Sequence, residues 1–254
     1  MDTTLFSKYT AAIRSSGTDV LDHRLLMQSD GKVSVYYAPF DIVNLGARIA
    51  IVGITPGKTQ MRNALAEARH QISAGARPEA ALASAKATAA FSGDMRSALV
   101  ALMDHVGLNN RLKLRSCEEL FTTARSLLQT CSVLPFPTFA GTEDYNGTPS
   151  PLTHPLLREQ VSRHFEPVLK ALAHAYFVPL GRVPTKVMLE LSKRGLIVRD
   201  RILDGLPHPS GANGERISYF LGRKPRELLS AKTDPGKIDA AKASLKQRIQ
   251  LMAA

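Results

Sequence analysis

Three short apolar runs, separated by helical sequence, constrain the fold of this chain more than any other feature. They are ARIAIVGI (47–54), SLLQTCSVLPF (126–136) and AYFVPLG (175–181). Their apolar character is typical of strands that are buried on both faces of a parallel sheet. A shorter fourth strand is expected in RDRILDG (199–205). Strands that alternate with helices predict an α/β fold, here a three-layer α/β/α sandwich around a mainly parallel sheet of about four strands.

The domain organisation is predicted from the length of the chain and from the positions of residues that end helices and strands. We expect one domain over residues 1–254, because the chain is long enough to bury a core and contains no repeat and no clear linker. Residues 1–45, with a short helix and the β-rich stretch KVSVYYAPF, form an N-terminal extension. Residues 58–90 form a helical insertion that breaks at positions 75–78, and residues 234–254 form an amphipathic C-terminal helix.

Net charge gives the main indication of a partner. The chain has 33 Lys and Arg against 22 Asp and Glu, a formal charge of +11. Such a field attracts polyanions through counterion release, and nucleic acid is the commonest polyanion in a cell. No apolar run approaches the roughly 18 residues that span a bilayer, and no signal-peptide pattern is present. We therefore expect a cytoplasmic protein that meets nucleoid DNA and has no membrane association.

Three loops follow the carboxyl ends of the predicted strands, where open α/β sheets bind ligands. The first, IVGITPGKTQ, leaves an apolar run at Gly53 and continues through a stiff turn. The second, at 135–155, has about twenty residues rich in Pro, Gly, Thr and Asn, a length that is usually functional. The third, LPHPSGANG, holds His208 between two prolines and is followed by Ser210. A rigid histidine can donate a hydrogen bond to an anion, and a serine with nearby amides can hold a phosphate. We expect these loops to converge.

Together, GITPG (53–57) and HPSGAN (208–213) resemble the two motifs of the uracil-DNA glycosylase superfamily. Its members carry Gly-x-(Asp/Asn/Ala)-Pro-(Tyr/Gly) after the first strand and His-Pro-Ser or a near relative after the last. AFSGDMRSALVALM looks like the superfamily's Phe-x-Gly segment, and EPVLKALAHAYFVPLG looks like its helix and third strand. The similarity spans residues 47–214. It implies a monomeric, monofunctional DNA N-glycosylase that flips one base out of duplex DNA and uses no metal or organic cofactor. The two cysteines, Cys117 and Cys131, exclude the iron–sulfur branch.

The resemblance also implies roles for individual residues. His208 would stabilise the leaving base, and Thr55 stands where most relatives place an Asp or Asn that positions water. The base pocket would be lined by Gly53, Ile54, Pro56, Gly57, Phe91, Ser132 and, from the second loop, Asn146. DNA would be contacted by Ser210, Gly211, Asn213, Arg216 and Lys58.

Three departures from the superfamily pattern affect the chemistry. A threonine hydroxyl orients water but is no general base near neutral pH, so Glu143 and Asp144 in the second loop are the candidate carboxylates. The alternative for that pair is an ordinary solvated acidic turn. Gly57 replaces the Tyr that blocks the pyrimidine ring in uracil-specific relatives, and Ser132 replaces an Asn that reads the uracil edge. Both changes favour a roomier pocket.

The sequence thus predicts hydrolytic removal of a non-standard base, most simply a modified pyrimidine such as a bulky hypermodified cytosine of phage DNA. That substrate would imply an antiviral role. The alternatives are a uracil-excising repair enzyme, a DNA-binding relative without catalysis and a hydrolase of free nucleosides. Among the other histidines, His154 is a candidate DNA contact. The remaining ones considered, His105, His164 and His174, are expected to have packing or surface roles.

Overall fold

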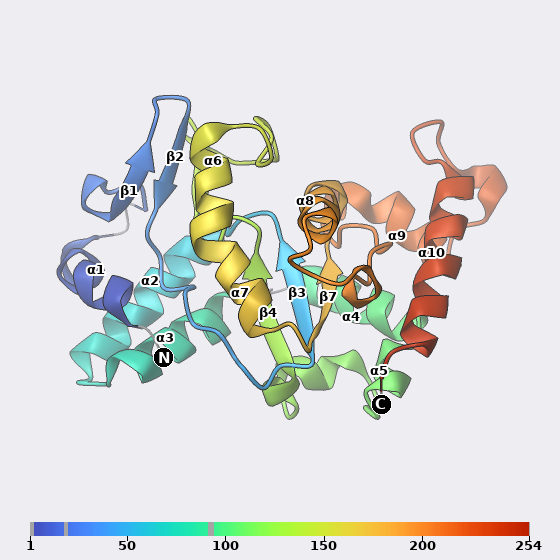
Figure 1. The fold of residues 1–254 in the computed structure, drawn as a ribbon, viewed down its shortest axis with the longest axis horizontal. Coiled ribbons are helices and arrows are strands. Elements are labelled where there is room, and N and C mark those ends of the chain that lie inside the picture. Colours follow the sequence, from blue (N-terminus) through green and yellow to red (C-terminus); the bar gives the residue numbers. More distant parts are fainter. Residues whose placement is uncertain (1–2, 18–19, 91–93, 254) are drawn as a thin grey trace. The chain divides into compact units, whose positions relative to one another are not determined.

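The computed structural model describes residues 3–17, 20–90 and 94–253 (Figure 1). The strands are β1 (Leu26–Ser29), β2 (Val33–Tyr36), β3 (Ile49–Gly53), β4 (Leu128–Ser132), β5 (Thr138–Ala140), β6 (Glu143–Asp144) and β7 (Tyr176–Pro179). The helices are α1 (Thr4–Ser15), α2 (Lys58–Ser73), α3 (Pro78–Ala89), α4 (Asp94–His105), α5 (Leu108–Arg111), α6 (Pro155–Gln160), α7 (Glu166–Ala171), α8 (Arg182–Lys193), α9 (Gly214–Phe220) and α10 (Pro235–Gln250). No helix in these ranges is both long and apolar enough to cross a bilayer.

The central sheet has the strand order β4-β3-β7, and β3 is its middle strand. The four residues 49–52 are fully buried, as the continuous apolar run predicts. β3 and β7 are parallel, with Ile49 opposite Tyr176 and Val52 opposite Pro179. The α/β class is confirmed. The expected fourth strand is reduced to one parallel bridge, between Phe177 and Ile202.

A second, antiparallel sheet, with the order β1-β2-β5-β6, was not predicted from the sequence. The stretch 135–155, expected to be one long loop, contributes β5 and β6 to it. Val33 pairs with Ala140 and Val35 with Thr138, so the partner strand lies about a hundred residues away in the chain. The local composition of residues 135–155 does not indicate strands, because Pro and Gly, which are depleted in strands, are frequent in it.

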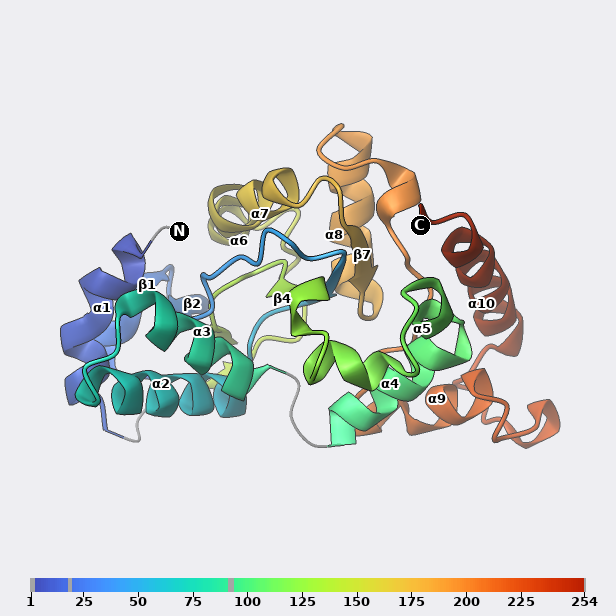
Figure 2. The same cartoon turned by 90° about the horizontal axis from the view of Figure 1, so that it is seen from below.

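The two helices predicted within residues 58–90 are confirmed as α2 and α3, which lie side by side (Figure 2). The turn between them contains Gly75 at φ +74°, and Pro78 is the first residue of α3. Both features are favoured at helix ends, because glycine tolerates positive φ and proline needs no helical N–H partner at the first position.

The chain is helical on both sides of Pro167, with a π-helical turn over Val161–Phe165 between α6 and α7. Proline lacks the N–H of the regular helical hydrogen bond and clashes with the preceding turn. The wider π turn just before it accommodates that defect without ending the helix.

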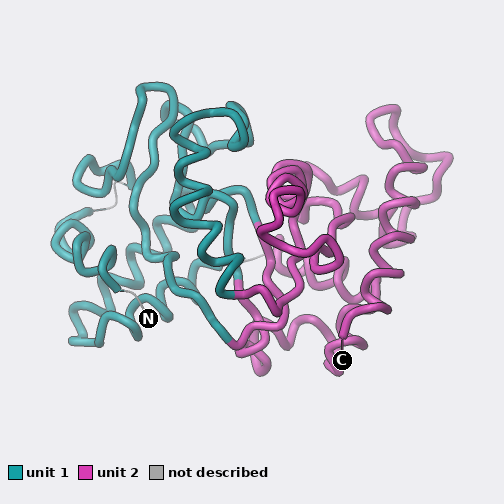
Figure 3. The backbone as a smooth tube through the Cα atoms, viewed as in Figure 1, with its two compact units in different colours: residues 1–45, 53–90, 130–171 teal, residues 46–52, 91–129, 172–254 magenta. Residues whose placement is uncertain are grey.

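The chain forms two compact units (Figure 3). Unit 1 comprises residues 1–45, 53–90 and 130–171, and unit 2 comprises residues 46–52, 91–129 and 172–254. Unit 1 therefore contains both the N-terminal extension and the helical insertion, and unit 2 contains the C-terminal helix. The division falls inside β3 and β4, so no linker separates the units along the chain.

Within unit 2, α10 packs tightly on the segment that leads to His208. Arg248 Nη2 donates to the backbone oxygen of Asp204 at 2.8 Å and lies 2.9 Å from its Oδ1. The next residue, Gly205, has φ +129°, and a Cβ there would lie 2.9 Å from the backbone oxygen of Ala241. Only glycine allows this close approach of helix and loop.

We expect Gly205→Ala to lower the free energy of unfolding by about 2 to 6 kcal/mol, because the backbone strain and the overlap with α10 each cost about 1 to 3 kcal/mol. Urea denaturation measures this loss. Gly214→Ala is the matched control, because Gly214 has helical φ and no neighbour within 4 Å of an added Cβ. Equal unfolding midpoints for the two variants would contradict the packing described for Gly205.

Candidate functional site

The loop after β3 is held by the loop after β4 in unit 1. Gly53 and Ile54 accept hydrogen bonds through their backbone oxygens from the N–H groups of Val133 (3.0 Å) and Leu134 (2.9 Å). A Cβ on Gly53 would lie 3.4 Å from Ser132 Oγ. The predicted neighbourhood of Gly53 and Ser132 is therefore present. The first two of the three loops converge as expected.

Thr55 ties the same two loops together through its side chain. Its hydroxyl donates to the backbone oxygen of Phe136 at 2.8 Å and accepts from the N–H of Thr138 at 3.1 Å. The proton of this hydroxyl is already used in a bond to a carbonyl. Thr55 therefore fixes the spacing of the loops, which is a positioning role rather than proton transfer.

Asp144 reaches the start of α2 from the second loop. Its Oδ1 accepts the N–H of Lys58 at 2.9 Å. Helix α2 begins after Gly57, which has no side chain to cap the exposed N–H groups, so the carboxylate of Asp144 supplies the cap. Within the described part of the chain, no hydrogen bond engages Oδ2 of Asp144. The structure thus places one of the two candidate carboxylates directly beside the first motif.

The space beside Gly57 differs from the expectation. A Cβ on Gly57 would lie 2.9 Å from Oδ2 and 3.4 Å from Cγ of Asp144. Gly57 therefore makes room for a carboxylate of the protein, and the inference that it leaves room for a bulky base was wrong at this point. Glu143 of β6 pairs with Ala140 of β5. Because successive side chains of a strand point to opposite faces, Glu143 belongs to the face of the sheet opposite to that of Asp144.

The contact between Gly57 and Asp144 can be tested without any activity. We expect Gly57→Ala to lower the free energy of unfolding by about 1 kcal/mol, because the added methyl group displaces the exposed carboxylate of Asp144 and weakens its bond to the N–H of Lys58. The same change made in an Asp144→Ala background should cost much less. Urea denaturation of the four proteins of this double-mutant cycle measures the coupling. Additive effects would contradict the contact.

The other residues expected in a base pocket are less informative. Asn146 is exposed, and its Oδ1 accepts the N–H of Thr148 at 3.2 Å, inside its own loop. Pro56 is buried within the first loop. Phe91, the expected stacking partner of the base, lies outside the described residues.

Lys86 is a buried cation of unit 1 that sequence analysis missed. It is 8% exposed on the Ala-rich helix α3, and its Nζ donates to the backbone oxygen of Ile42 at 2.5 Å. Burial lowers the pKa of Lys86 to about 8, although Cys131 and Asp41 act in the opposite direction. Its contact fixes the segment that precedes β3.

His208 is held in unit 2 with one ring nitrogen occupied. The backbone N–H of Ser210 donates to Nδ1 at 3.3 Å. Burial lowers the pKa of His208, so the imidazole is neutral near pH 7. A neutral imidazole that accepts at Nδ1 carries its proton on Nε2. The local structure thus presents the Nε2–H of His208 as a hydrogen-bond donor.

Gly181 gives this imidazole its room, and sequence analysis missed it. Gly181 has φ +81° at the start of α8, and a Cβ there would lie 3.2 Å from Cβ and 3.6 Å from Cδ2 of His208. The available signal was its place just after the third predicted strand, at the same edge of the sheet as the loop of His208.

The residues after His208 form a connected polar loop. Asn213 donates from Nδ2 to Ser210 Oγ at 3.2 Å and accepts at Oδ1 from Arg216 Nη1 at 2.9 Å. Gly211 is exposed between them. Four of the predicted DNA contacts therefore lie close together in unit 2, on the loop after His208 and on the first turn of α9. The fifth, Lys58, is the first residue of α2 in unit 1.

The remaining histidines have structural partners or lie at the surface. His154, a candidate DNA contact, is 14% exposed and pairs with Asp30 of the β1–β2 turn at 3.1 Å. His164 packs edge-on against Phe136, and His105 packs against Phe220. Burial lowers the pKa of both His105 and His164. The packing roles predicted for these two histidines are confirmed, and His174 is exposed.

Comparison with known proteins identifies a relative but no activity. No family model matches the sequence, and no solved structure matches it. The chain is similar to a protein of Bacillus subtilis (strain 168) named "Uncharacterized protein YoxB", with 32% identity over 210 residues. The matched region covers 82% of this chain and 82% of the relative. The chain therefore belongs to the same protein family as YoxB of Bacillus subtilis.

Proposed function

We propose that this protein is a DNA glycosylase that hydrolyses the N-glycosidic bond of a flipped-out, non-standard base and leaves an abasic site. The observation that carries the proposal is the neutral His208, whose Nδ1 is occupied by the N–H of Ser210 and whose Nε2–H is a ready donor. The resemblance of both loops to the uracil-DNA glycosylase superfamily and the charge of +11 support it. The superfamily's three-layer sandwich with four central strands is part of the proposal.

His208 would act on the leaving base. Cleavage of the bond between base and sugar develops negative charge on the base and positive charge on the sugar. A donor held in place before the reaction stabilises that negative charge without reorganisation. In this proposal the Nε2–H of His208 donates to the oxygen or nitrogen of the base on which the charge accumulates.

Asp144 would act on the attacking water. Its Oδ1 is fixed by the N–H of Lys58, which orients the carboxylate, and Oδ2 accepts a proton from water as the bond to the sugar forms. The negative charge also favours the cationic sugar. Thr55 contributes by holding the second loop, and therefore β6, against the first motif.

The substrate remains a prediction. The proposed substrate is a modified pyrimidine, which would imply an antiviral role. The space beside Gly57 gives no support to a bulky 5-substituent, because Asp144 occupies it. Uracil is the alternative. We also propose a cytoplasmic monomer that acts on nucleoid DNA.

A panel of duplexes tests the proposal. Each duplex carries uracil, hypoxanthine, 5-hydroxymethylcytosine or its glucosylated form at one position, and alkaline cleavage reveals abasic sites. The proposal predicts strand cleavage with at least one modified base and none with the unmodified duplex. Intact strands with every base would contradict it.

A DNA-binding relative without catalysis is the second candidate. The observation that favours it is the hydroxyl of Thr55, which bonds to the backbone at the position where relatives carry a water-positioning acid or amide. This candidate predicts salt-sensitive DNA binding and no abasic product with any base.

A further inference from the structure

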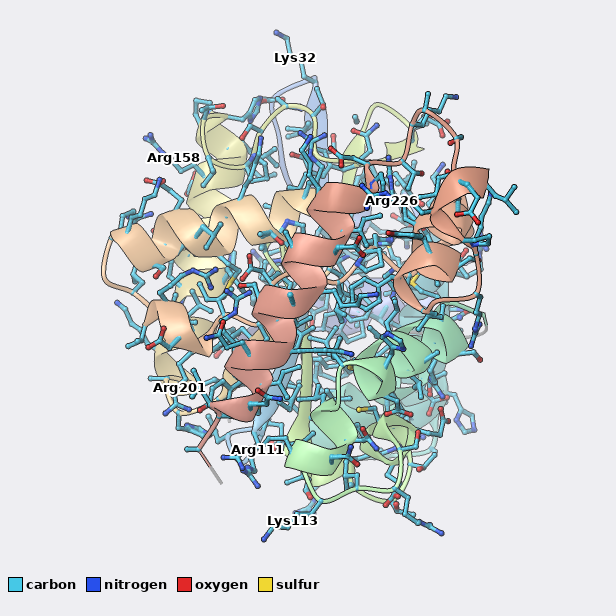
Figure 4. All side chains as sticks on the ribbon, turned by 90° about the vertical axis from the view of Figure 1, so that its right-hand side faces the viewer. Lys32, Arg111, Lys113, Arg158, Arg201 and Arg226 are labelled. Carbon is cyan, nitrogen blue, oxygen red and sulfur yellow. The ribbon has the colours of Figure 1, made fainter. Side chains whose placement is uncertain are left out.

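A basic segment follows helix α9 in unit 2 and lies outside the two motifs of the candidate site. Residues 222–233 have the sequence GRKPRELLSAKT, with four Lys or Arg and a single acidic residue, Glu227. Arg226 and Glu227 are exposed on it. Figure 4 shows Arg226 beside the N-terminal end of α10, whereas Lys113 lies toward the opposite end of that helix.

This segment is rigidly built in spite of its exposure. The carboxylate of Glu215 accepts hydrogen bonds from Lys224 Nζ at 2.7 Å, from Ser230 N at 3.1 Å and from Ser230 Oγ at 2.6 Å. It also accepts from the hydroxyl of Thr233. One carboxylate thus ties both arms of the loop to the start of α9. These bonds hold the pKa of Glu215 well below its usual range.

The tip of the loop presents an apolar side chain. Residues Arg226–Leu228 form a 3₁₀ turn, in which the N–H of Leu228 donates to the backbone oxygen of Pro225 at 3.2 Å. Leu228 is 63% exposed. A single exposed leucine needs no explanation on an ordinary surface. Here it stands on a clamped turn next to an exposed arginine.

The loop is joined directly to the one that follows His208. Arg216 bonds through Nη1 to Asn213 Oδ1 at 2.9 Å and through Nη2 to the backbone oxygen of Lys232 at 3.2 Å. The two loops therefore keep a fixed spacing. The loop after His208 offers only Gly211 and Ala212 at its exposed turn, and neither side chain is large enough to fill a gap in a base stack.

We propose that residues 222–233 are a second contact with duplex DNA, in which Leu228 inserts between bases as a wedge and Arg226 binds a backbone phosphate. Apolar wedges on basic elements unstack bases in this way, and a flipped nucleotide leaves a gap for one to fill. The net positive charge of the segment favours the negatively charged backbone of DNA as its partner over a protein surface with few acidic residues. The inference rests on the proposed function in taking duplex DNA with a flipped-out nucleotide as the ligand.

The wedge is tested by fluorescence with the full-length protein. The probe is a duplex with a tetrahydrofuran abasic analogue, which cannot be cleaved, and 2-aminopurine beside it, whose fluorescence rises on unstacking. We expect Leu228→Ala to lose most of the rise at saturating protein. Leu251→Ala is the matched control, because Leu251 is 76% exposed at the far end of α10, and it should keep the full rise. Both leucines are exposed, so both variants should fold normally, which urea denaturation checks.

The phosphate contact is tested by salt dependence. We expect Arg226→Gln to reduce the slope of log K against log salt by about 0.9, the value for one lost phosphate contact. Lys113→Gln, which removes a charge toward the opposite end of α10, should leave the slope unchanged. An unchanged slope in Arg226→Gln would overturn this part of the inference.

The outcomes separate the wedge from the glycosylase. If Leu228→Ala keeps the full rise while the wild type releases a base, the wedge is wrong and the proposed function stands. If Leu228→Ala loses the rise but no base is ever released, the wedge stands and the proposed function fails. Absence of DNA binding would overturn both.

Discussion

Replacing His208 by alanine is expected to slow base release by about 10² to 10³-fold in single-turnover reactions, because the leaving base loses a preorganised donor. The affinity for duplex DNA should change little, since the loop from Ser210 to Arg216 keeps its own hydrogen bonds. Quenched reactions on an end-labelled duplex measure the first quantity, and fluorescence anisotropy measures the second. Together they distinguish catalysis from binding.

Two further measurements check the role of His208: replacement of another histidine, and the pH dependence of the wild-type rate. His174→Ala removes an exposed histidine and should leave the rate unchanged. The wild-type rate should also fall at acidic pH, because protonation puts a second proton on Nδ1, where Ser210 donates. Burial lowers the pKa of His208, so that fall should lie on the acid side of the ordinary histidine value. A His208→Ala variant with the wild-type rate would refute the role.

Replacing Asp144 by asparagine is expected to slow base release by about 10² to 10⁴-fold, the usual contribution of a general base. Stability should hardly change, because an asparagine side chain also accepts the N–H of Lys58 and caps α2 well. Single-turnover kinetics and urea denaturation on the same variant separate the two roles. A loss of stability with an unchanged rate would mean that Asp144 is only a helix cap.

Glu143→Gln is the matched control for this change. Glu143 precedes Asp144 on β6 and is exposed, but it belongs to the opposite face of the strand. Its rate should equal that of the wild type. In the double variant His208→Ala/Asp144→Asn, the rate of base release should fall by less than the product of the two single-variant factors. The effects of two groups that act on the same reaction are not additive in free energy.

The parts of the fold that depend on local signals were predictable from the sequence. β3 is a continuous apolar run, and the break between α2 and α3 is marked by Gly75 and Pro78. β5 and β6 were not predicted, because β5 pairs with β2, about a hundred residues earlier, and β6 pairs in turn with β5, whereas their own composition is rich in Pro and Gly.

In the candidate site too, local features were predictable from the sequence and long-range contacts were not. Gly57 and His208 were found through stiff loops at strand ends, which are local features. The bonds that explain them are distant in sequence, since Asp144 is 86 residues from Lys58 and Phe136 is 81 residues from Thr55. No local pattern shows that a carboxylate fills the space beside Gly57, so the sequence suggested room for a base instead.

The central claim is that this protein hydrolyses a base from DNA, and product analysis by mass spectrometry tests it most directly. Duplexes with each non-standard base are incubated with the wild type and with His208→Ala, and free base and abasic sites are counted in the same reaction. We predict equal amounts of the two products with the wild type and a rate lower by about 10² to 10³-fold with the variant. Tight, salt-sensitive binding of every duplex with neither product would contradict the claim.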